Sequence, residues 1–269
     1  SFTLLSIEIF YAANQSKSEK IAFLEDKGYL KINNQFQMLE GSLHRYRNFT
    51  RLISKSIQYP FNKHFSEDLF EISNDVFDRF LLVKDKMGVF KLRLVAEDGQ
   101  ELLNYHVKED TIDKNVNLEN ISDRYYYQQF KDSQEYIYFS NFDLYMENGV
   151  TKKPYIETLR TLTKIYFKEK VYFLIVDFNI SSVMEKILKT TLYEVFLTDL
   201  DGYINLHLNK DFFFAKQLQR NITLQKLKDE GFYYITQKRF NDMKYNMVLG
   251  IKQSQIDDIE QAYTNSIVY

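Results

Sequence analysis

Cysteine and tryptophan are absent from this sequence of 269 residues, and proline and glycine are scarce, with two and eight residues. Without cysteine there can be no disulfide, no thiol nucleophile and no cysteine-ligated metal site. The absence fits a periplasmic or extracellular chain that avoids mispairing, although many cytosolic chains share it. The low proline and glycine content excludes collagen-like repeats and long flexible linkers.

An excess of one charge and a long apolar run are also missing. Lys and Arg number 35, Asp and Glu number 37, and the net charge is −2. These charges are spread along the chain, so we expect no nucleic-acid partner, because a phosphate-binding surface needs clustered Lys and Arg. The apolar stretch 2–13 is interrupted by Glu8 and is too short to span alone, since a bilayer needs about 20 apolar residues. It lacks a basic segment before it, and from the start at Ser1 we expect an excised fragment or a processed chain.

Hydrophobic residues make up 45% of the sequence and charged residues 27%, which is typical of a soluble globular protein with one large or two modest cores. Aromatic residues are abundant, with 21 Tyr and 23 Phe. Tyrosine in this number suits half-exposed sheets or an aromatic pocket.

Motifs for catalysis are not found. The sequence has no nucleophile elbow, Walker loop or dinucleotide-binding glycine pattern, and its carboxylate pairs have no recognisable acid/base context. The four histidines show no metal-ligand spacing; they are His44, His64, His106 and His207. Asp199 and Asp201 could suggest calcium, but no further carboxylates complete such a loop, so we interpret them as a turn. We expect no enzymatic activity, cofactor or metal.

A long helix is predicted from residue 17 to about residue 62, ended by Pro60. Its residues recur at alternating spacings of four and three, which is the seam of a heptad pattern. The seam consists of Ile32, Phe36, Leu39, Leu43, Tyr46, Thr50, Ile53 and Ile57. Such a helix either packs against its own domain or also pairs with a partner chain as a stalk.

The rest of the chain alternates helical and strand patterns, which predicts an α+β fold on antiparallel or mixed sheets. Helices are expected at 66–84 with a Ser66 cap, at 122–131 with a Ser122 cap, at 181–189 and at 254–269. The segment 110–118 is expected to be a loop. Strands are expected at 89–95, 102–107, 136–140, 156–167, 171–180, 192–198, 203–208, 232–240 and 243–252. The hairpin at Asp98-Gly99 is repeated at Asp201-Gly202, which indicates a second, smaller unit.

The order of these elements resembles the double-Cache, or tandem PAS-like, sensor domains of bacterial transmembrane receptors. A more specific likeness lies in residues 138–149, Tyr-Phe-Ser-Asn-Phe-Asp-Leu-Tyr-Met-Glu-Asn-Gly, followed by Pro154 and Arg160. The resemblance implies a long N-terminal stalk helix (1–65), a membrane-distal ligand-binding domain (66–190), a membrane-proximal domain (191–253) and an exit helix (254–269), with each domain on an antiparallel sheet.

The resemblance also implies roles for individual residues. In the amino-acid-binding branch an Arg-x-Trp-Tyr motif grips a carboxylate and walls the pocket, and a late Asp takes the ammonium. Arg124, Tyr127 and Asp177 match this pattern, while Tyr126 stands where Trp is expected. Phe142, Gln129 and Glu119 depart from it, which predicts a ligand other than the usual free amino acid. The full predicted ligand-binding set is Arg124, Tyr126, Tyr127, Phe142, Asp143, Glu147, Arg160 and Asp177.

Residue chemistry alone leaves alternatives open for the two charged ends of this pocket. The guanidinium of Arg124 can hold a carboxylate with two hydrogen bonds, or it can pair with Asp123 or another neighbouring carboxylate. Asp177 lies in an apolar strand, where it needs a cation such as a ligand ammonium, Arg124 or Arg160.

We therefore expect the extracytoplasmic, small-molecule-sensing part of a bacterial membrane receptor, with a sensor histidine kinase as the first choice among a kinase, a diguanylate cyclase and a chemoreceptor. It would bind a carboxylate- or amine-bearing metabolite and reach the membrane through flanking segments outside the sequence. It could form a homodimer through the stalk helix. The alternative is a structural or protein-interaction module that dimerises through the helix and takes no small ligand.

Overall fold

The computed structural model describes the backbone of most of the chain, and it describes the side chains from residue 18 onward except at 81 and 147. The described backbone covers residues 2–59, 68–81, 87–107, 111–114, 118–147, 150–151, 153–240, 243–258 and 261. Two compact units are present: residues 40–184, here called the seven-stranded unit, and residues 1–39 with 185–269, here called the four-stranded unit.

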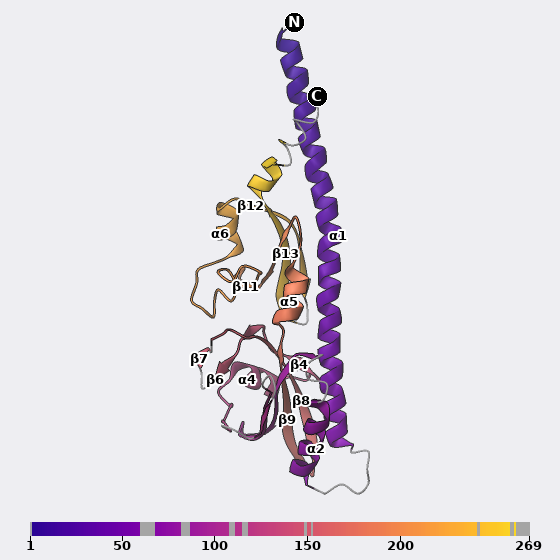
Figure 1. Ribbon diagram of the computed structural model, residues 1–269, viewed down its shortest axis with the longest axis vertical. Coiled ribbons are helices and arrows are strands. Elements are labelled where there is room, and N and C mark those ends of the chain that lie inside the picture. The colour runs from indigo at the N-terminus through magenta and orange to yellow at the C-terminus, as the bar shows by residue number, and fades with distance from the viewer. Residues whose placement is uncertain are drawn as a thin grey trace. The chain divides into compact units, whose positions relative to one another are not determined.

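A single helix, α1 (Phe2–Gln58), supplies one segment to each unit (Figure 1). All eight residues of the predicted heptad seam are buried, so the seam packs within the chain itself. The helix ends at Gln58, whereas Pro60 lies outside the described residues. No helix within the described ranges is both long enough and apolar enough to cross a membrane.

The seven-stranded sheet is antiparallel throughout its described pairs, in the order β3-β2-β1-β9-β8-β4, with β5 also pairing with β8. Its strands are β1 (Val89–Ala96), β2 (Glu101–Val107), β3 (Ile112–Lys114), β4 (Tyr138–Phe139), β5 (Asp143–Leu144), β8 (Glu157–Phe167) and β9 (Lys170–Asn179). A separate hairpin joins β6 (Met146–Glu147) to β7 (Val150–Thr151). The predicted loop at 110–118 was wrong at β3, because Ile112 to Lys114 pair with the edge of β2.

Two helices accompany this sheet, α2 (Leu69–Leu81) and α4 (Tyr125–Lys131). The predicted Ser66 cap lies outside the described residues. The predicted Ser122 cap was wrong, because α4 begins at Tyr125 with Arg124 at the N-cap position and no capping side chain. The preceding segment is held to the hairpin by the Ile121 N–H, which donates to Gly99 O at 2.8 Å. The helix can therefore begin only after this tether.

The two faces of the seven-stranded sheet have different neighbours. On one face, Phe173 and Ile175 of β9 pack against Tyr126, Tyr127 and Phe130 of α4. On the other, Phe178 of β9 contacts the α1 rings of Tyr46 and Phe49. There Thr161 of β8 and Thr50 of α1 share a buried hydrogen bond of 2.5 Å between their hydroxyls.

The four-stranded sheet has the order β11-β10-β13-β12 and is also antiparallel. Its strands are β10 (Glu194–Thr198), β11 (Ile204–Leu206), β12 (Phe232–Phe240) and β13 (Tyr245–Lys252), preceded by α5 (Ser181–Leu188). Helix α6 (Leu224–Asp229), which the sequence did not predict, lies beside β12 (Figure 1). Its Leu227 packs with Phe196, Phe232 and Val248. Of the predicted final helix at 254–269, residues 254–258 and 261 are described, and they are helical.

The two Asp-Gly hairpins predicted as a repeat are both present. Gly99 has φ +89° and donates its N–H to Ala96 O, and Gly202 has φ +84° and donates its N–H to Asp199 O. Positive φ is the left-handed region of backbone conformation, which favours glycine because a Cβ would be crowded there. The α+β class, the long N-terminal helix and the two antiparallel sheets are therefore confirmed.

Candidate functional site

Three neighbouring strands bring charged side chains together on the α4 side of the seven-stranded sheet. In the register of β1, β9 and β8, Lys91 lies opposite Asp177, and Asp177 lies opposite Arg160. Residues opposite each other on antiparallel strands point to the same face. Arg93 is two residues from Lys91 on β1, so it points to that face as well. These four residues form the charged end of a face that packs elsewhere against α4 through apolar side chains such as Phe173 and Ile175.

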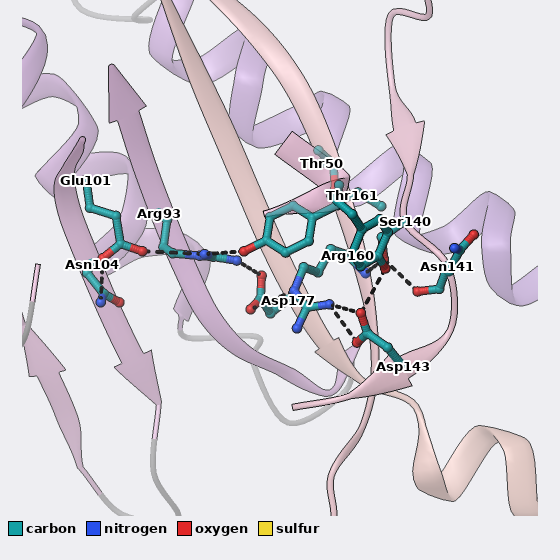
Figure 2. A network of polar contacts seen from close by, with 12 residues as sticks. Thr50, Arg93, Glu101, Asn104, Ser140, Asn141, Asp143, Arg160, Thr161 and Asp177 are labelled. Atoms are coloured by element: carbon teal, nitrogen blue, oxygen red, sulfur yellow. Dashed lines mark hydrogen bonds and ion pairs between the residues drawn. The ribbon is translucent and has the colours of Figure 1, made fainter. Parts of the chain in front are cut away.

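Asp177 lies between two arginines (Figure 2). Its Oδ1 accepts from Arg93 Nη2 at 2.6 Å, and its Oδ2 is 3.6 Å from Arg160 Nε. All three side chains are no more than 4% exposed. A buried carboxylate needs such partners to offset its lost hydration. The partners of Asp177 are therefore Arg160, one of the predicted alternatives, and Arg93.

Each arginine has a second acidic partner farther from Asp177. Both oxygens of Asp143 lie 2.6 Å from Arg160 Nη1, and the Tyr125 hydroxyl donates to Asp143 Oδ2 at 2.8 Å. Arg93 Nη1 is 3.4 Å from Glu101 Oε1. Figure 2 shows Glu101 and Asp143 at opposite ends of the network.

Tyr126 packs its ring against both guanidiniums. The carbon centre of Arg160 lies 4.7 Å from the ring centroid and that of Arg93 lies 5.7 Å from it. Its hydroxyl accepts a hydrogen bond from Arg93 Nη1 at 3.1 Å. An aromatic face attracts a nearby cation, so Tyr126 helps to fix both arginines.

The two buried aspartates have opposite pKa shifts. Burial raises the pKa of Asp177, but Arg93, Arg160 and Lys91 outweigh it and hold that pKa below its usual value. For Asp143, burial outweighs the lowering effect of Arg160 and Tyr125, so its pKa lies above the usual value. Asp177 is thus the fixed negative charge of the network.

Lys91 differs from the arginines of this network in having no direct partner among the described residues. Its side chain is buried, and burial together with repulsion by Arg93 lowers its pKa. Asp177, Glu101 and Glu119 act in the opposite direction at longer range. Within the described part of the chain, the ammonium makes no ion pair or hydrogen bond. Burying a cation without a direct partner is unfavourable in free energy. An anion bound beside Lys91 would supply that partner.

These groups surround a small cavity of about 20 Å³, which has room for roughly one water molecule. The lining residues are Lys91, Arg93, Glu119, Ile121, Arg124, Tyr126, Tyr145, Met146, Arg160 and Asp177. Four of them are cations and two are acids, so cationic groups predominate at its wall.

Arg124 occupies the less buried side of this cavity, with 19% of its side chain exposed. Its Nη2 is 3.5 Å from Glu119 Oε2, and its Nε is 3.8 Å from Asp123 Oδ1. The ion pair with a neighbouring carboxylate, one of the two alternatives for this residue, is thus present. Among the described residues its guanidinium makes only these long contacts, so its terminal nitrogens can turn toward a ligand.

The predicted site residues fall into three groups. Arg124, Tyr126, Arg160 and Asp177 line the cavity. Asp143 lies behind Arg160, and Tyr127 and Phe142 are core residues away from the lining. The Tyr127 hydroxyl, for example, donates to Glu97 O at 2.6 Å. Glu147 has a described backbone in β6, but its side chain lies outside the described residues.

Sequence reasoning missed Lys91 and Arg93 as site residues. The signal was present as basic residues at every second position of a predicted strand. Within the described residues, no group of three or more His, Asp or Glu side chains could hold a metal ion. The arrangement is suited to holding a small anion.

In sequence, the chain matches no family model and no curated protein. Its fold, however, matches solved sensory domains over nearly its whole length. The sensory domain of the Campylobacter jejuni chemoreceptor Tlp3, solved with isoleucine bound, has a TM-score of 0.59 at 15% identity and covers 92% of this chain and 98% of its own.

Two further structures give similar values. A domain of a protein described as a sensory box/GGDEF family member from Vibrio parahaemolyticus has a TM-score of 0.57 at 12% identity, covering 91% of this chain and 99% of its own. The extracellular domain of a protein described as the histidine kinase vpHK1S-Z8 has the same TM-score and identity, covering 91% and 94%. The chain therefore has the fold of receptor sensory domains, which confirms the resemblance at the level of fold.

Proposed function

We propose that this chain is the extracytoplasmic sensing region of a bacterial transmembrane receptor and that its seven-stranded unit binds a small carboxylate-bearing metabolite. The fold shared with sensory domains of a chemoreceptor, a GGDEF protein and a histidine kinase supports the sensing role. A sensor histidine kinase remains our first choice of output. In this proposal the kinase and the membrane-spanning segments lie outside the sequence.

The observation that carries the ligand class is Lys91. A ligand carboxylate would give this buried ammonium the direct partner that the described residues do not supply. Charge-assisted hydrogen bonds of this kind are about twice as strong as neutral ones. Arg124, on the less buried side, could take the second oxygen or a second carboxylate.

A ligand amine fits less well. Both carboxylates at the cavity wall already have an arginine, since Asp177 pairs with Arg93 and Glu119 pairs with Arg124. An ammonium would have to compete with these guanidiniums while lying beside Lys91. These pairings support our proposal of a carboxylate from the predicted carboxylate-or-amine class, with Asp177 supporting two arginines.

The cavity must widen to admit a metabolite, because about 20 Å³ holds little more than a water molecule. The long contact between Arg124 and Glu119 is the weakest charged link at its wall. We expect ligand entry to separate this pair while Asp177, Arg93 and Arg160 keep their geometry.

The test is thermal unfolding of the whole chain with acetate, lactate, succinate and citrate, beside methylamine and putrescine as amines. At least one carboxylate should raise the midpoint, because a ligand that binds only the folded state stabilises it. Lys91→Met should abolish that rise, and Arg124→Ala should reduce it. Lys170→Met is the matched control, because Lys170 is an exposed residue of β9 outside the cavity, and it should keep the full rise.

Two results would contradict the ligand assignment. One is a midpoint raised by amines and by none of the carboxylates. The other is a carboxylate-induced rise that persists unchanged in a folded Lys91→Met protein, as judged by its circular dichroism.

The interaction-module alternative has one supporting observation. On α1, Phe23, Tyr29 and Leu30 are between 59% and 61% exposed, although the predicted heptad seam is buried. A homodimer would therefore use this other face. Sedimentation that shows a dimer in the wild type and a monomer in Leu30→Glu, together with no carboxylate-induced rise, would favour that function.

A further inference from the structure

A second cavity lies in the four-stranded unit and is much larger, at about 360 Å³. This volume falls in the usual range for small-molecule pockets, roughly 300–1,000 Å³. The lining comes from the end of α5, the start of β10, the segment after β11 and the end of β13. Its residues are Leu188, Thr190, Tyr193, Glu194, Val195, His207, Leu208, Asn209, Phe212 and Lys252.

Glu194 is the charged centre of this cavity. Its Oε2 accepts from His207 Nε2 at 3.0 Å, and its Oε1 lies 3.4 Å from Lys252 Nζ. Burial would raise the pKa of Glu194, but His207 and Lys252 outweigh burial and hold it below the usual value. The group is therefore a carboxylate at neutral pH.

His207 orients this carboxylate. The Asn209 N–H donates to His207 Nδ1 at 3.0 Å, and His207 Nε2 donates to Glu194 Oε2. The imidazole also stacks on Phe196, with ring centroids 4.5 Å apart and planes 9° apart. These contacts hold the imidazole in place beside Glu194.

Lys252 is a loosely held partner, because 52% of its side chain is exposed and its distance to Glu194 is long. An exposed ion pair of this kind contributes little free energy. The Lys252 ammonium can therefore move away into solvent, whereas Glu194 is held in place by its hydrogen bond with His207. The fixed charge that a ligand meets is negative.

We propose that this cavity is a second ligand site, which binds a small organic ammonium ion with an apolar or aromatic body. The ammonium donates to Glu194 in place of Lys252, and the body packs among Leu188, Val195 and Leu208. Phe212 also lines the cavity, and an aromatic ring can attract the cation. An organic anion would instead face this carboxylate, with the exposed ammonium of Lys252 as its partner among the described lining residues. The site is independent of the carboxylate cavity in the other unit.

The test uses three probes of one shape and three charges: benzylamine, benzyl alcohol and benzoate. Titration calorimetry on the whole chain at neutral pH should show benzylamine binding at least about tenfold more tightly than the other two, as a charge-assisted hydrogen bond provides. Glu194→Gln keeps the shape but removes the charge, so it should weaken benzylamine about tenfold. Lys252→Gln removes the competitor and should strengthen it.

All variants are compared in a Lys91→Met background as well, which removes carboxylate binding by the seven-stranded unit. If the carboxylate proposal for the seven-stranded unit fails, the proposal for the cavity in the four-stranded unit is unaffected, so the two proposals are tested separately. The second-site proposal is overturned if none of the probes binds, if benzoate binds most tightly and depends on Lys252, or if Glu194→Gln leaves benzylamine binding unchanged. Because Lys252→Gln alters an exposed side chain, its predicted gain in affinity does not depend on Glu194→Gln folding normally.

Discussion

In the seven-stranded unit, four cationic and two acidic side chains converge on a cavity of about 20 Å³, whereas in the four-stranded unit a cavity of about 360 Å³ contains one carboxylate and its two partners. In the first cavity, most of the charged side chains pair with one another and leave almost no free volume. In the second, there is room but few groups to recognise a ligand. A ligand of the first cavity must join an existing charge network, and a ligand of the second needs to replace only one weak contact.

The largest expected difference between the two units concerns their acidic centres. Asp177→Ala leaves Arg93 and Arg160 buried with one carboxylate fewer, and we expect it to lower the free energy of unfolding by about 3–5 kcal/mol. Glu194→Ala removes an ion pair with an exposed lysine and leaves the buried His207 Nε2 without its acceptor, so it should cost about 1–3 kcal/mol. Urea unfolding of the two variants measures both values. Equal losses of unfolding free energy in the two variants would show that the deeper burial of the Asp177 network does not make it more important for stability.

The second comparison uses the repeated hairpins. Gly99 and Gly202 have nearly the same positive φ, but a Cβ on Gly99 would lie 2.7 Å from Ser122 N, whereas one on Gly202 would meet nothing within 4 Å. Gly202→Ala should cost about 1–2 kcal/mol for its backbone conformation alone. Gly99→Ala adds a steric overlap and should cost about 1–3 kcal/mol more.

Urea midpoints of the two alanine variants measure this difference. If both cost the same, the close approach of Ser122 to the first hairpin is not a constraint on folding. A larger cost at Gly202 would reverse the comparison.

The smallest expected effect is a gain in stability from Lys91→Met. The pKa of Lys91 is lowered in the folded state, so the unfolded chain binds this proton more tightly and protonation favours unfolding. The variant should therefore be more stable than the wild type by on the order of 1 kcal/mol at neutral pH. This gain should be complete below the folded-state pKa and vanish as the pH rises above the unfolded value near about 10.4.

Unfolding in urea at several pH values checks this prediction, with Lys170→Met as the exposed control that should show no such gain. A Lys91→Met protein that is less stable than the wild type at neutral pH would mean that the ammonium has favourable contacts. That outcome would remove the main support for an anion site.

Periodicity predicted most of the fold because each pattern was local. The helical seam of α1, the strands β8 and β9, and both Asp-Gly hairpins follow from residues that are neighbours in sequence. The start of α4 did not, because the Ile121 N–H is held by Gly99, far away along the chain. The short edge strand β3 owes its conformation to pairing with β2 rather than to its own residues.

The candidate site, like the fold, was predictable only in part from the sequence. Arg124, Tyr126, Arg160 and Asp177 were expected from the family resemblance, and they line one cavity. Lys91 and Arg93 gave a strand pattern, but nothing in β1 indicates which strand it pairs with. Only the register with β9 brings Lys91 opposite Asp177. The cavity in the four-stranded unit likewise depends on Glu194 meeting His207 from another strand end.

The hydroxyl pair of Thr50 and Thr161 gives the seven-stranded unit a direct connection from its cavity to α1. Arg160 and Thr161 are consecutive on β8, so one side chain lies in the charge network while the next touches the helix on the opposite face. Any movement of β8 would therefore displace the wall of the cavity and the contact with α1 together, because one strand carries both side chains.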